Sequence, residues 1–432
     1  MPGRGLAKVY GISPASAVLA GIAPARYDNP TPPPEARAMF DLAAVQAALR
    51  TQSLDGWLLY DFRGLNVLAA RVAGTADAHR SRRWFYYVPA HGGPKKLVHR
   101  IEPAALDHLP GGDKTVYLRW QELEASIPLL LTGAKRVAME YSPDNGNPYV
   151  SRVDAGTVEL VRKCGAEVVS SGDLIQQFEA TWDDAQYLMH QEAATHTDAA
   201  YGVAWAFIGN EIRRAGHTTE LAVQARIMKH FADTNLVTDH PPIVGVGPHS
   251  GDPHYAPTAA TDARIEPGSF VLIDLWAKAD KPRAVYSDLT RVGFVGEQIP
   301  AKIQEVFQVV VDARDAAIDR VKRAFAANEP LQGWQVDAAA RDVIDRAGYG
   351  DYFSHRTGHN IGQETHGNGC HMDGLETKEE RRVLPRTCFS IEPGVYLPEF
   401  GVRSEVNVYI DAAGGVHVTG GPLQHEIRRV VV

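Results

Sequence analysis

The sequence has few cysteines, no long apolar run and no excess of positive charge. Its three cysteines, Cys164, Cys370 and Cys388, lack the spacing of a metal cluster, so we expect a reducing compartment, the cytoplasm, and no disulfide framework. No apolar run approaches the roughly 20 residues that span a bilayer. The net charge of −8 gives no reason to expect nucleic acid or an acidic membrane surface as a partner.

A nucleotide-binding glycine loop is also missing from the amino-terminal half, where the glycine pairs at 92–93 and 111–112 are typical of turns. What is present is the composition of an ordinary globular protein, with 44% hydrophobic and 22% charged residues. A length of 432 residues exceeds that of one ordinary domain and fits two.

Residues 1–34 differ from the rest because they are rich in alanine, glycine and proline and end in a proline-rich run at 30–34. We interpret them as an arm with a stiff spacer. A signal peptide with a cleavage-like site at 23–25 is the alternative. Its apolar part is short and is interrupted at 13–16, which favours the arm.

From Glu35 onward, the periodicity predicts an α/β protein of two domains. Apolar strands alternate with amphipathic helices over 35–179, as is typical of one α/β domain. The predicted strands there are 57–60, 84–88, 96–99, 116–118, 136–140 and 167–170, and the predicted helices are 35–52, 123–131 and 153–163. A long helix from about Asp183 to Asn210 then begins with capping and acidic residues. We therefore place the domain boundary near Glu179.

The second part, residues 180–432, is predicted to mix further helices and strands. The helices are 217–231, 299–325 and 334–347, and the main strands are 270–276, 284–290, 388–392, 402–410, 416–419 and 426–431. The two long helices carry an apolar stripe, so core packing is their expected role.

The stretch from Ser354 to Gly369 is dense in polar and small residues and reads SHRTGHNIGQETHGNG. It carries His355, His359 and His366 but few apolar side chains that could pack a core. Polar side chains at this density usually face a cleft, a ligand or a metal. Taken alone, the stretch could equally be a surface loop that makes hydrogen bonds.

Two apolar strands each contain one aspartate. Asp274 lies in 270–276, Asp288 lies in 284–290, and the segment 279–282 between them is a turn-type sequence. Opposed residues of an antiparallel hairpin have numbers with a constant sum, and these two aspartates are centred inside the turn. We therefore expect Asp274 and Asp288 to be cross-strand neighbours on one face.

Two glutamates obey the same relation. Glu392 ends the strand 388–392, Glu405 lies in the strand 402–410, and 397–401 is a turn. The centre of the pair again falls in the turn, so the second hairpin is also predicted to place two carboxylates opposite each other.

Four carboxylates inside apolar strands need compensation, because an ionised carboxylate in a dry interior costs several kcal/mol. Lys278, Arg291 or Arg403 could neutralise some of them, and Arg403 shares a strand face with Glu405. Salt bridges do not explain all four. Hard oxygen ligands with one imidazole suit a pair of divalent ions such as Mn²⁺, Fe²⁺, Co²⁺ or Zn²⁺.

The order Asp, Asp, His, Glu, Glu resembles that of the pita-bread metallopeptidases, namely methionine aminopeptidase, aminopeptidase P, prolidase and the metal-free relative creatinase. The matching segments are LIDLWAK, YSDLTRVGF, HRTGHNIGQETHG, SIEPGVY and GVRSEVNVYI, and five ordered motifs are more specific than one. The first part is similar in length and pattern to the amino-terminal domain of aminopeptidase P, prolidase and creatinase. The resemblance implies a creatinase-like α/β domain over 35–179 and an α+β pita-bread catalytic domain over 180–432.

The resemblance also implies five metal ligands. Asp274 would chelate one ion, Asp288 and Glu405 would bridge two ions, and His359 and Glu392 would bind the other. Two ions about 3.5–4 Å apart can bind one water and make it a hydroxide near neutral pH. Glu392 is the best candidate to shuttle a proton to the leaving nitrogen.

Five further residues are expected around the substrate. His254 in the HYAPT segment and His366 match catalytic cleft histidines of the family, and Arg403 matches the arginine two before the last glutamate. His355 either lines the cleft or holds the loop, with no preference between the two. Trp276 departs from the family, which has a small pair after the first aspartate, and it either narrows the cleft or packs beside it.

These observations predict a metallopeptidase that cleaves Xaa-Pro bonds in short peptides, as an aminopeptidase P or a prolidase, with two divalent ions, Mn²⁺ before Zn²⁺, Co²⁺ or Fe²⁺. One alternative is a diverged dinuclear hydrolase of a non-peptide amide or ester, which Trp276 favours. Another is a metal-free binding or scaffolding homologue, which the presence of all five ligands disfavours. A homodimer is expected from the resemblance alone.

Overall fold

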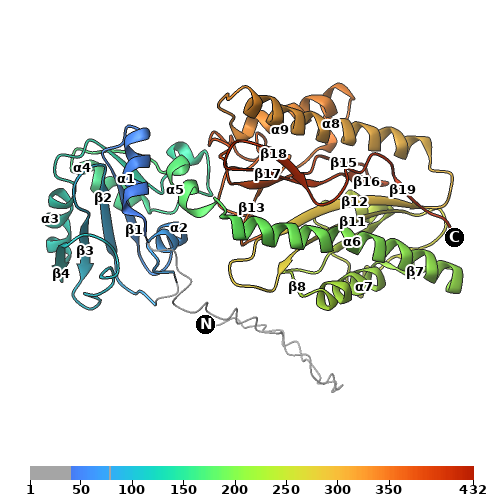
Figure 1. The fold of residues 1–432 in the computed structure, drawn as a ribbon, viewed down its shortest axis with the longest axis horizontal. Coiled ribbons are helices and arrows are strands. Elements are labelled where there is room, and N and C mark those ends of the chain that lie inside the picture. Colours follow the sequence, from blue (N-terminus) through green and yellow to red (C-terminus); the bar gives the residue numbers. More distant parts are fainter. Residues whose placement is uncertain (1–39, 77–78) are drawn as a thin grey trace, which may run out of the picture. The chain divides into compact units, whose positions relative to one another are not determined.

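The apolar strands of the amino-terminal part form one six-stranded mixed sheet in the computed structural model, which describes residues 40–76 and 79–432 (Figure 1). The predicted arm, residues 1–34, lies outside the described residues. The order is β4-β3-β2-β1-β5-β6. The strands are β1 (Gly56–Asp61), β2 (Trp84–Pro89), β3 (Lys95–His99), β4 (Asp113–Tyr117), β5 (Arg136–Met139) and β6 (Glu167–Ser170).

Helices cover both faces of this sheet because its strands are apolar on both sides. Side chains of α1 (Leu42–Thr51), α2 (Val67–Val72) and α5 (Gly172–Glu179) share one hydrophobic core with the sheet. Side chains of α3 (Trp120–Leu130) and α4 (Ala155–Lys163) share the other. This is the α/β pattern that the sequence predicts, although α2 and α5 have no counterpart among the predicted helices.

The carboxy-terminal part is built on two larger sheets. One has the order β19-β12-β11-β8, with β9 also pairing β11; its strands are β8 (Leu236–Val237), β9 (Ile243–Val246), β11 (Phe270–Ala279), β12 (Ser287–Val295) and β19 (Arg428–Val430). The other has the order β13-β14-β17-β18, formed by β13 (Asn360–Ile361), β14 (Cys388–Ile391), β17 (Val406–Ile410) and β18 (Val416–Thr419). Two small pairs join β15 (Gly394–Tyr396) to β16 (Gly401–Arg403), and β7 (Thr218–Thr219) to β10 (Arg264–Ile265).

Two helix pairs cover these sheets, and Figure 1 shows α8 and α9 side by side above them and α6 and α7 below. The pairs are α6 (Asp184–Ala215) with α7 (Glu220–Asp233), and α8 (Ala301–Ala326) with α9 (Gly333–Arg346). The first pair shares a core with β11 and β12, and the second shares a core with β14 to β17. The predicted apolar stripes therefore pack against the sheets.

The long helix α6 begins and ends as its sequence dictates. Asp183 caps its start by accepting a hydrogen bond from the Gln186 amide. The Gln186 side chain in turn accepts a hydrogen bond from the Asp183 amide. It continues to Ala215, beyond the predicted end at Asn210, because the first left-handed residue is Gly216, with φ 78°.

Ala38–Val432 form one compact unit. Within it α5 ends at Glu179 and α6 begins at Asp184. The division into domains at 179 stays a prediction. None of the helices in 40–76 and 79–432 combines the length and the apolar character that crossing a bilayer requires.

Candidate metal centre and substrate pocket

The first pair of carboxylates lies on the hairpin of β11 and β12. Asp274 faces Thr290 and Trp276 faces Asp288 in the register. The two aspartates are therefore diagonal neighbours on one face, and the prediction that they are directly opposed is wrong by two residues. The reason is the connection: residues 280–286 form a loop in which Arg283 has φ 61°, so β12 begins at Ser287 and not at Ala284.

The second pair of carboxylates lies where one hairpin is interrupted. Ile391 pairs with Val406 and Gly394 pairs with Arg403, so this register places Glu392 and Glu405 opposite each other, as the sequence predicts. The ladder stops between these pairs because Pro393 has no amide hydrogen.

The two glutamate amides bond to other segments at this interruption. Glu392 donates to the Thr357 carbonyl at 2.7 Å, and Glu405 donates to the Thr290 carbonyl at 3.2 Å. The second glutamate is thereby attached to the strand that carries Asp288.

His359 is held against β14 by its own main chain. Its amide donates to Ser390 Oγ at 2.9 Å, and the preceding Gly358 packs so closely that a Cβ there would lie 2.0 Å from the Ser390 carbonyl oxygen. Its Nδ1–H donates to the Asn360 carbonyl at 3.2 Å. The lone pair of Nε2 is therefore directed at Asp288 Oδ2, 3.4 Å away, and at Glu392 Oε1, 3.3 Å away.

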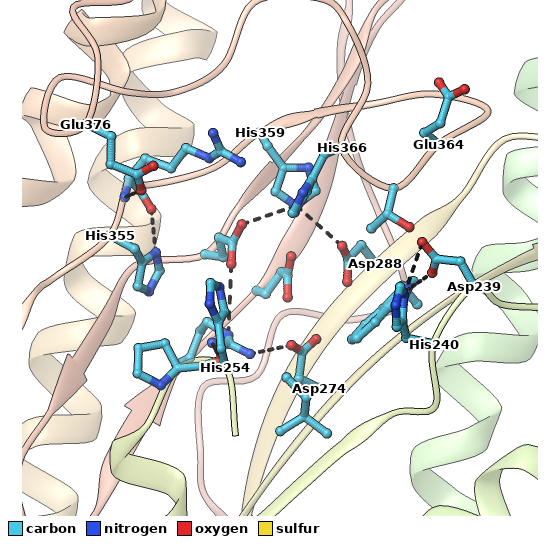
Figure 2. A pocket seen from close by; sticks show the side chains of 18 of the residues that line it. Asp239, His240, His254, Asp274, Asp288, His355, His359, Glu364, His366 and Glu376 are labelled. Carbon is cyan, nitrogen blue, oxygen red and sulfur yellow. Dashed lines mark hydrogen bonds and ion pairs between the residues drawn. The ribbon is translucent and has the colours of Figure 1, made fainter. Parts of the chain in front are cut away.

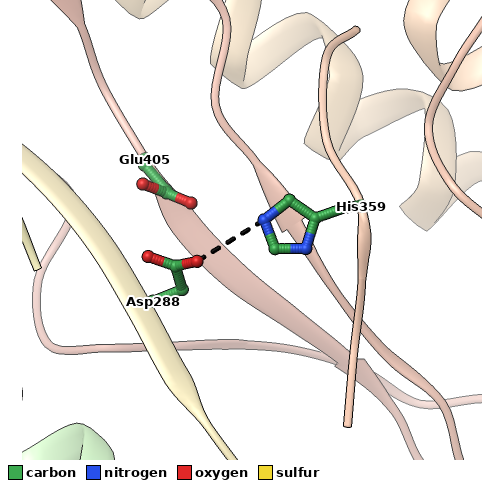
Figure 3. A group of neighbouring side chains, drawn as sticks. All are labelled: Asp288, His359 and Glu405. Atoms are coloured by element: carbon green, nitrogen blue, oxygen red, sulfur yellow. Dashed lines mark ion pairs between the residues drawn. The ribbon is translucent and has the colours of Figure 1, made fainter. Parts of the chain in front are cut away.

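Three of the predicted ligands form a compact group. Asp288, His359 and Glu405 are buried and offer ligand atoms that all lie within 4.8 Å of one another (Figure 3). Glu405 Oε1 and Asp274 Oδ1 are buried and accept no hydrogen bond from the described residues. An imidazole lone pair facing carboxylates, together with two unsatisfied oxygens, fits a divalent cation.

Arg403 partly balances the charge of this group. Its Nη2 donates to Asp274 Oδ2, its Nε donates to Thr290 Oγ1 at 2.9 Å, and its Nη1 donates to the Tyr396 hydroxyl at 3.0 Å. Thr290 Oγ1 in turn donates to Glu405 Oε2 at 2.7 Å. The arginine thus reaches Glu405 through a hydroxyl, and it forms ion pairs with Asp274 and, at 3.9 Å from Nε to Oε2, with Glu392.

One arginine does not compensate four carboxylates. Burial raises the pKa of Asp274 to about 6 and that of Asp288 to about 7, although Arg403 opposes both shifts. Burial also raises the pKa of Glu392 and Glu405. Burial lowers the pKa of His359. The four carboxylates are therefore destabilised in their charged forms, and a bound cation would remove that penalty; His359 is favoured as the neutral ring, the form that binds a cation.

All ten predicted site residues line one cavity of about 540 Å³. Figure 2 shows His254, His355, His359 and His366 around the carboxylates. The ring of His366 stands edge-on to that of His359, with centroids 4.3 Å apart. The structure therefore brings together the residues that the sequence singled out, while their roles stay predictions.

The other cleft residues are held in different ways. His355 donates from Nδ1 to the Arg356 carbonyl at 2.6 Å and accepts at Nε2 from the Tyr396 hydroxyl at 2.7 Å. Both ring nitrogens are thus occupied, so His355 holds the loop and also lines the cavity. His254 is exposed on the loop that follows η3 (Gly247–Gly251).

Trp276 lines the cavity and also packs beside it. Its Nε1 donates to Asp239 Oδ1 at 2.6 Å, and its ring packs against a cluster that includes Trp182 and Tyr286. Its role toward a substrate stays a prediction.

Several residues that line or support the pocket were not predicted from the sequence. Thr290 is two residues after Asp288 on the same strand face, which is a signal that could have identified it. Arg356 lies inside the singled-out stretch. Tyr149, Asp239 and Tyr396 line or support the cavity without any motif of their own.

Comparisons with known proteins agree with this geometry. The profile of metallopeptidase family M24 matches residues 189–412. The "Probable dipeptidase PepE" of Mycobacterium tuberculosis (strain H37Rv) is 34% identical over 346 residues, which are 79% of this chain and 84% of that protein. The Xaa-Pro dipeptidase of Lactobacillus delbrueckii subsp. lactis is 31% identical over 54% of this chain and 58% of its own length.

The first curated relatives are matched over 65%, 58% and 53% of their lengths, so the chain spans about half to two thirds of them. Among solved structures, dipeptidase PepE from Mycobacterium ulcerans is similar with a TM-score of 0.63 and 26% identity. The match covers 90% of this chain and 97% of that one.

Proposed function

The chain belongs to metallopeptidase family M24, and from that premise we propose that it is a dinuclear metal-dependent dipeptidase that cleaves Xaa-Pro bonds. The observation that supports the proposal is the buried group of Asp288, His359 and Glu405, whose ligand atoms lie within 4.8 Å of one another. The names of the relatives, dipeptidase and Xaa-Pro dipeptidase, support the choice of substrate.

Five side chains would hold two divalent ions, with Mn²⁺ the first candidate. They are Asp274, Asp288, His359, Glu392 and Glu405, which all line the cavity. When bound, such ions supply a Lewis acid and lower the pKa of water to near neutrality. The unsatisfied oxygens of Asp274 and Glu405 support this set.

Glu392 is proposed as the proton carrier. Its Oε1 accepts a hydrogen bond from Ser390 Oγ at 3.0 Å and lies 3.3 Å from His359 Nε2, so the carboxylate is oriented at the edge of the group. A carboxylate there can take a proton from the attacking water and deliver it to the leaving nitrogen.

The histidines of the cavity are proposed to polarise the scissile carbonyl. His254 and His366 line the cavity, and an imidazole N–H can donate to the oxygen that becomes negative in the transition state. A bond to proline is a tertiary amide without N–H, so recognition must come from the shape of the ring. His355 and Trp276 supply ring faces in the cavity wall for that purpose.

Metal-dependent hydrolysis tests the proposal. We expect metal-stripped enzyme to be inactive on Gly-Pro and on a longer Xaa-Pro-Xaa peptide, and added Mn²⁺ to restore cleavage of Gly-Pro. Asp288→Asn should lower kcat/KM at least about 100-fold. Loss of a residue that only orients a metal ligand lowers activity about 10- to 100-fold, and loss of the ligand itself should have a larger effect. Asp342→Asn, at an exposed position of α9, is the matched control and should retain full activity.

Two results would contradict the proposal. Cleavage by metal-stripped enzyme would remove the metal from the mechanism. Failure to cleave either peptide, with two ions per chain found by elemental analysis, would exclude the Xaa-Pro bond and favour a non-peptide substrate beside Trp276. Preference for the longer peptide would instead make the enzyme an aminopeptidase P.

The homodimer and the cytoplasmic location stay predictions, because they rest on the family resemblance and on the low cysteine content. Sedimentation of the purified protein would measure the first, and fractionation of cells would measure the second.

A further inference from the structure

The side chain of His366 has no hydrogen bond that keeps it in place. The residue is exposed and lines the cavity, and within residues 40–76 and 79–432 neither ring nitrogen has a hydrogen-bond partner. Its ring stands edge-on to His359, with centroids 4.3 Å apart. The position of the imidazole is therefore set by the main chain that carries it, residues 362–368, which we call the His366 loop.

An arginine of the amino-terminal part reaches this loop. Arg71 lies in α2; its Nη1 donates to Glu364 Oε2 at 3.2 Å and its Nη2 donates to Glu364 Oε1. Two donors of one guanidinium thus bind one carboxylate, a geometry that fixes the orientation of both groups. Figure 2 shows Glu364 directed away from Asp288 and His359, so its carboxylate is not part of the proposed metal centre.

The same guanidinium reaches the other end of the loop through a second carboxylate. Arg71 Nη1 donates to Glu179 Oε1 at 2.7 Å, and the Glu179 side chain is only 10% exposed. The same Oε1 accepts a hydrogen bond from Asn368 Nδ2 at 2.9 Å. Glu364 and Asn368 are two residues before and two residues after His366. Arg71 is therefore connected to both sides of the histidine.

Other contacts of the loop involve its main chain. Lys278 Nζ donates to the Gln363 carbonyl at 2.6 Å, and the Gly367 amide donates to the Asn360 carbonyl at 2.7 Å. These bonds fix the path of the chain at single points. The orientation of the peptide units next to His366 depends in addition on the two flanking side chains that Arg71 binds.

We propose that Arg71 is a positioning residue that holds His366 beside the metal centre through Glu364 and Glu179. The proposal rests on the proposed function, in which His366 polarises the scissile carbonyl. The Arg71 and Glu364 side chains are 36% and 49% exposed, and an ion pair at this exposure adds little to stability. Its effect on the reaction is larger, because displacement of a reacting group by about 1 Å can lower a rate about 100-fold.

Kinetics of two variants test this role. With Mn²⁺ and Gly-Pro, Arg71→Met should lower kcat about 10-fold and leave KM unchanged, because a group that acts only in the transition state affects kcat and kcat/KM equally. Glu364→Ala should lower kcat to a similar extent. It keeps the pair of Arg71 with buried Glu179, so its urea midpoint should equal that of the wild type. Wild-type kcat in both variants would overturn the proposal.

A double variant separates positioning of His366 from a general effect on the fold. In a His366→Ala background, Arg71→Met should cause no further loss of kcat, since the group that it positions is already gone. The same tenfold loss in that background would overturn the proposal. Arg214→Met, which removes an exposed arginine paired with Glu211, is the matched control and should keep wild-type kcat.

Hydrogen exchange tests the contact without turnover. In the Mn²⁺-loaded protein, the amides of residues 362–368 should exchange at least about 10-fold faster in Arg71→Met and in Glu364→Ala than in the wild type, and Arg214→Met should match the wild type. Unchanged exchange in both variants would overturn the proposal. If wild-type enzyme cleaves no Xaa-Pro peptide, the proposed function fails, whereas faster exchange in the two variants still supports the hold of Arg71 on the His366 loop.

Discussion

At the scale of single residues, a histidine outside the pocket sets part of the pH dependence of stability. His190 is fully buried, donates from Nδ1 to the Tyr286 carbonyl at 2.8 Å and accepts at Nε2 from Thr419 Oγ1 at 2.6 Å. The contact at Nε2 requires the neutral ring, whereas Nδ1–H can donate to the carbonyl in either protonation state. Burial lowers the pKa of His190 to about 4, although the bond to Tyr286 opposes the shift.

The sign of the effect follows from which state binds the proton. Unfolded chains take up a proton near pH 6.5 and the folded protein only near pH 4, so the free energy of unfolding falls as pH decreases through that window. From pH 7.5 to pH 5 the wild type should lose about 2 kcal/mol more than His190→Gln, which has no proton to bind. Urea denaturation at the two pH values measures this difference.

The matched control is His91→Gln, which changes an exposed histidine and should keep the wild-type pH dependence. Equal losses in His190→Gln and wild type would mean that the ring is already protonated in the folded state.

The five proposed metal ligands could be singled out from the sequence because each is an anomaly, a carboxylate inside an apolar strand or a histidine in a glycine-rich loop. Thr290 and Tyr396, which orient Arg403 and His355, are ordinary residues for a strand. Nothing in their local sequence distinguishes a hydroxyl that forms a hydrogen bond with a site residue from one that is exposed to water.

At the scale of elements, the loop that carries His254 depends on one buried carboxylate. Glu220, at the start of α7, accepts hydrogen bonds from the Val246 and Ala263 amides at 2.8 and 3.0 Å and from the Tyr255 hydroxyl at 2.7 Å. It also bonds His249 Nδ1 at 2.9 Å. This one side chain therefore fixes both ends of the loop around His254.

Glu220→Ala should cost about 3 kcal/mol or more of stability, because several buried donors lose their acceptor. It should also lower kcat/KM by displacing His254. Thermal denaturation and the Gly-Pro assay measure the two effects. Glu211→Ala, at a partly exposed position of α6 and paired with Arg214, is the control, and an unfolding free energy of Glu220→Ala equal to that of the control would show that water replaces the carboxylate.

The two hairpins show when a register can be predicted. In the second, the turn sequence 397–401 is short, and the pairing on both sides of it agrees with the prediction for Glu392 and Glu405. In the first, the connection runs from 280 to 286, longer than its turn-type sequence indicates, and the register moves by two residues. A shift of two keeps each side chain on its face, so Asp274 and Asp288 still point into one site.

At the scale of the whole molecule, one buried carboxylate joins distant parts of the chain, because it forms an ion pair with a near neighbour and a hydrogen bond to a residue 232 positions away. Glu379 accepts from Asn147 Nδ2 and from Arg381 Nε at 2.8 Å, and Glu379 and Arg381 are both buried. Its loss would leave the arginine charge without a partner.

Glu379→Ala should therefore lower the free energy of unfolding by about 3–5 kcal/mol. Calorimetric unfolding measures this change. Glu380→Ala, an exposed neighbour paired with Lys378, should keep the wild-type stability, and equal stability of the two variants would show that the Arg381 charge does not need this partner.

The fold class and family could be predicted because five motifs occur in a fixed order, which can be read directly from the sequence. The contribution of the amino-terminal part to the pocket could not be predicted. Tyr149 is 207 positions from Arg356, and no periodicity or spacing relates residues at that distance.

The hydrogen bond from Arg356 Nη1 to the Tyr149 hydroxyl spans these 207 positions, so the pocket depends on folding of the whole chain. A nascent or truncated chain that contains all five ligand positions but lacks an ordered Tyr149 has a guanidinium with nothing to hold it. The bond joins the amino-terminal part to the pocket loop over 207 positions. The pocket is therefore complete only in chains in which both parts have folded.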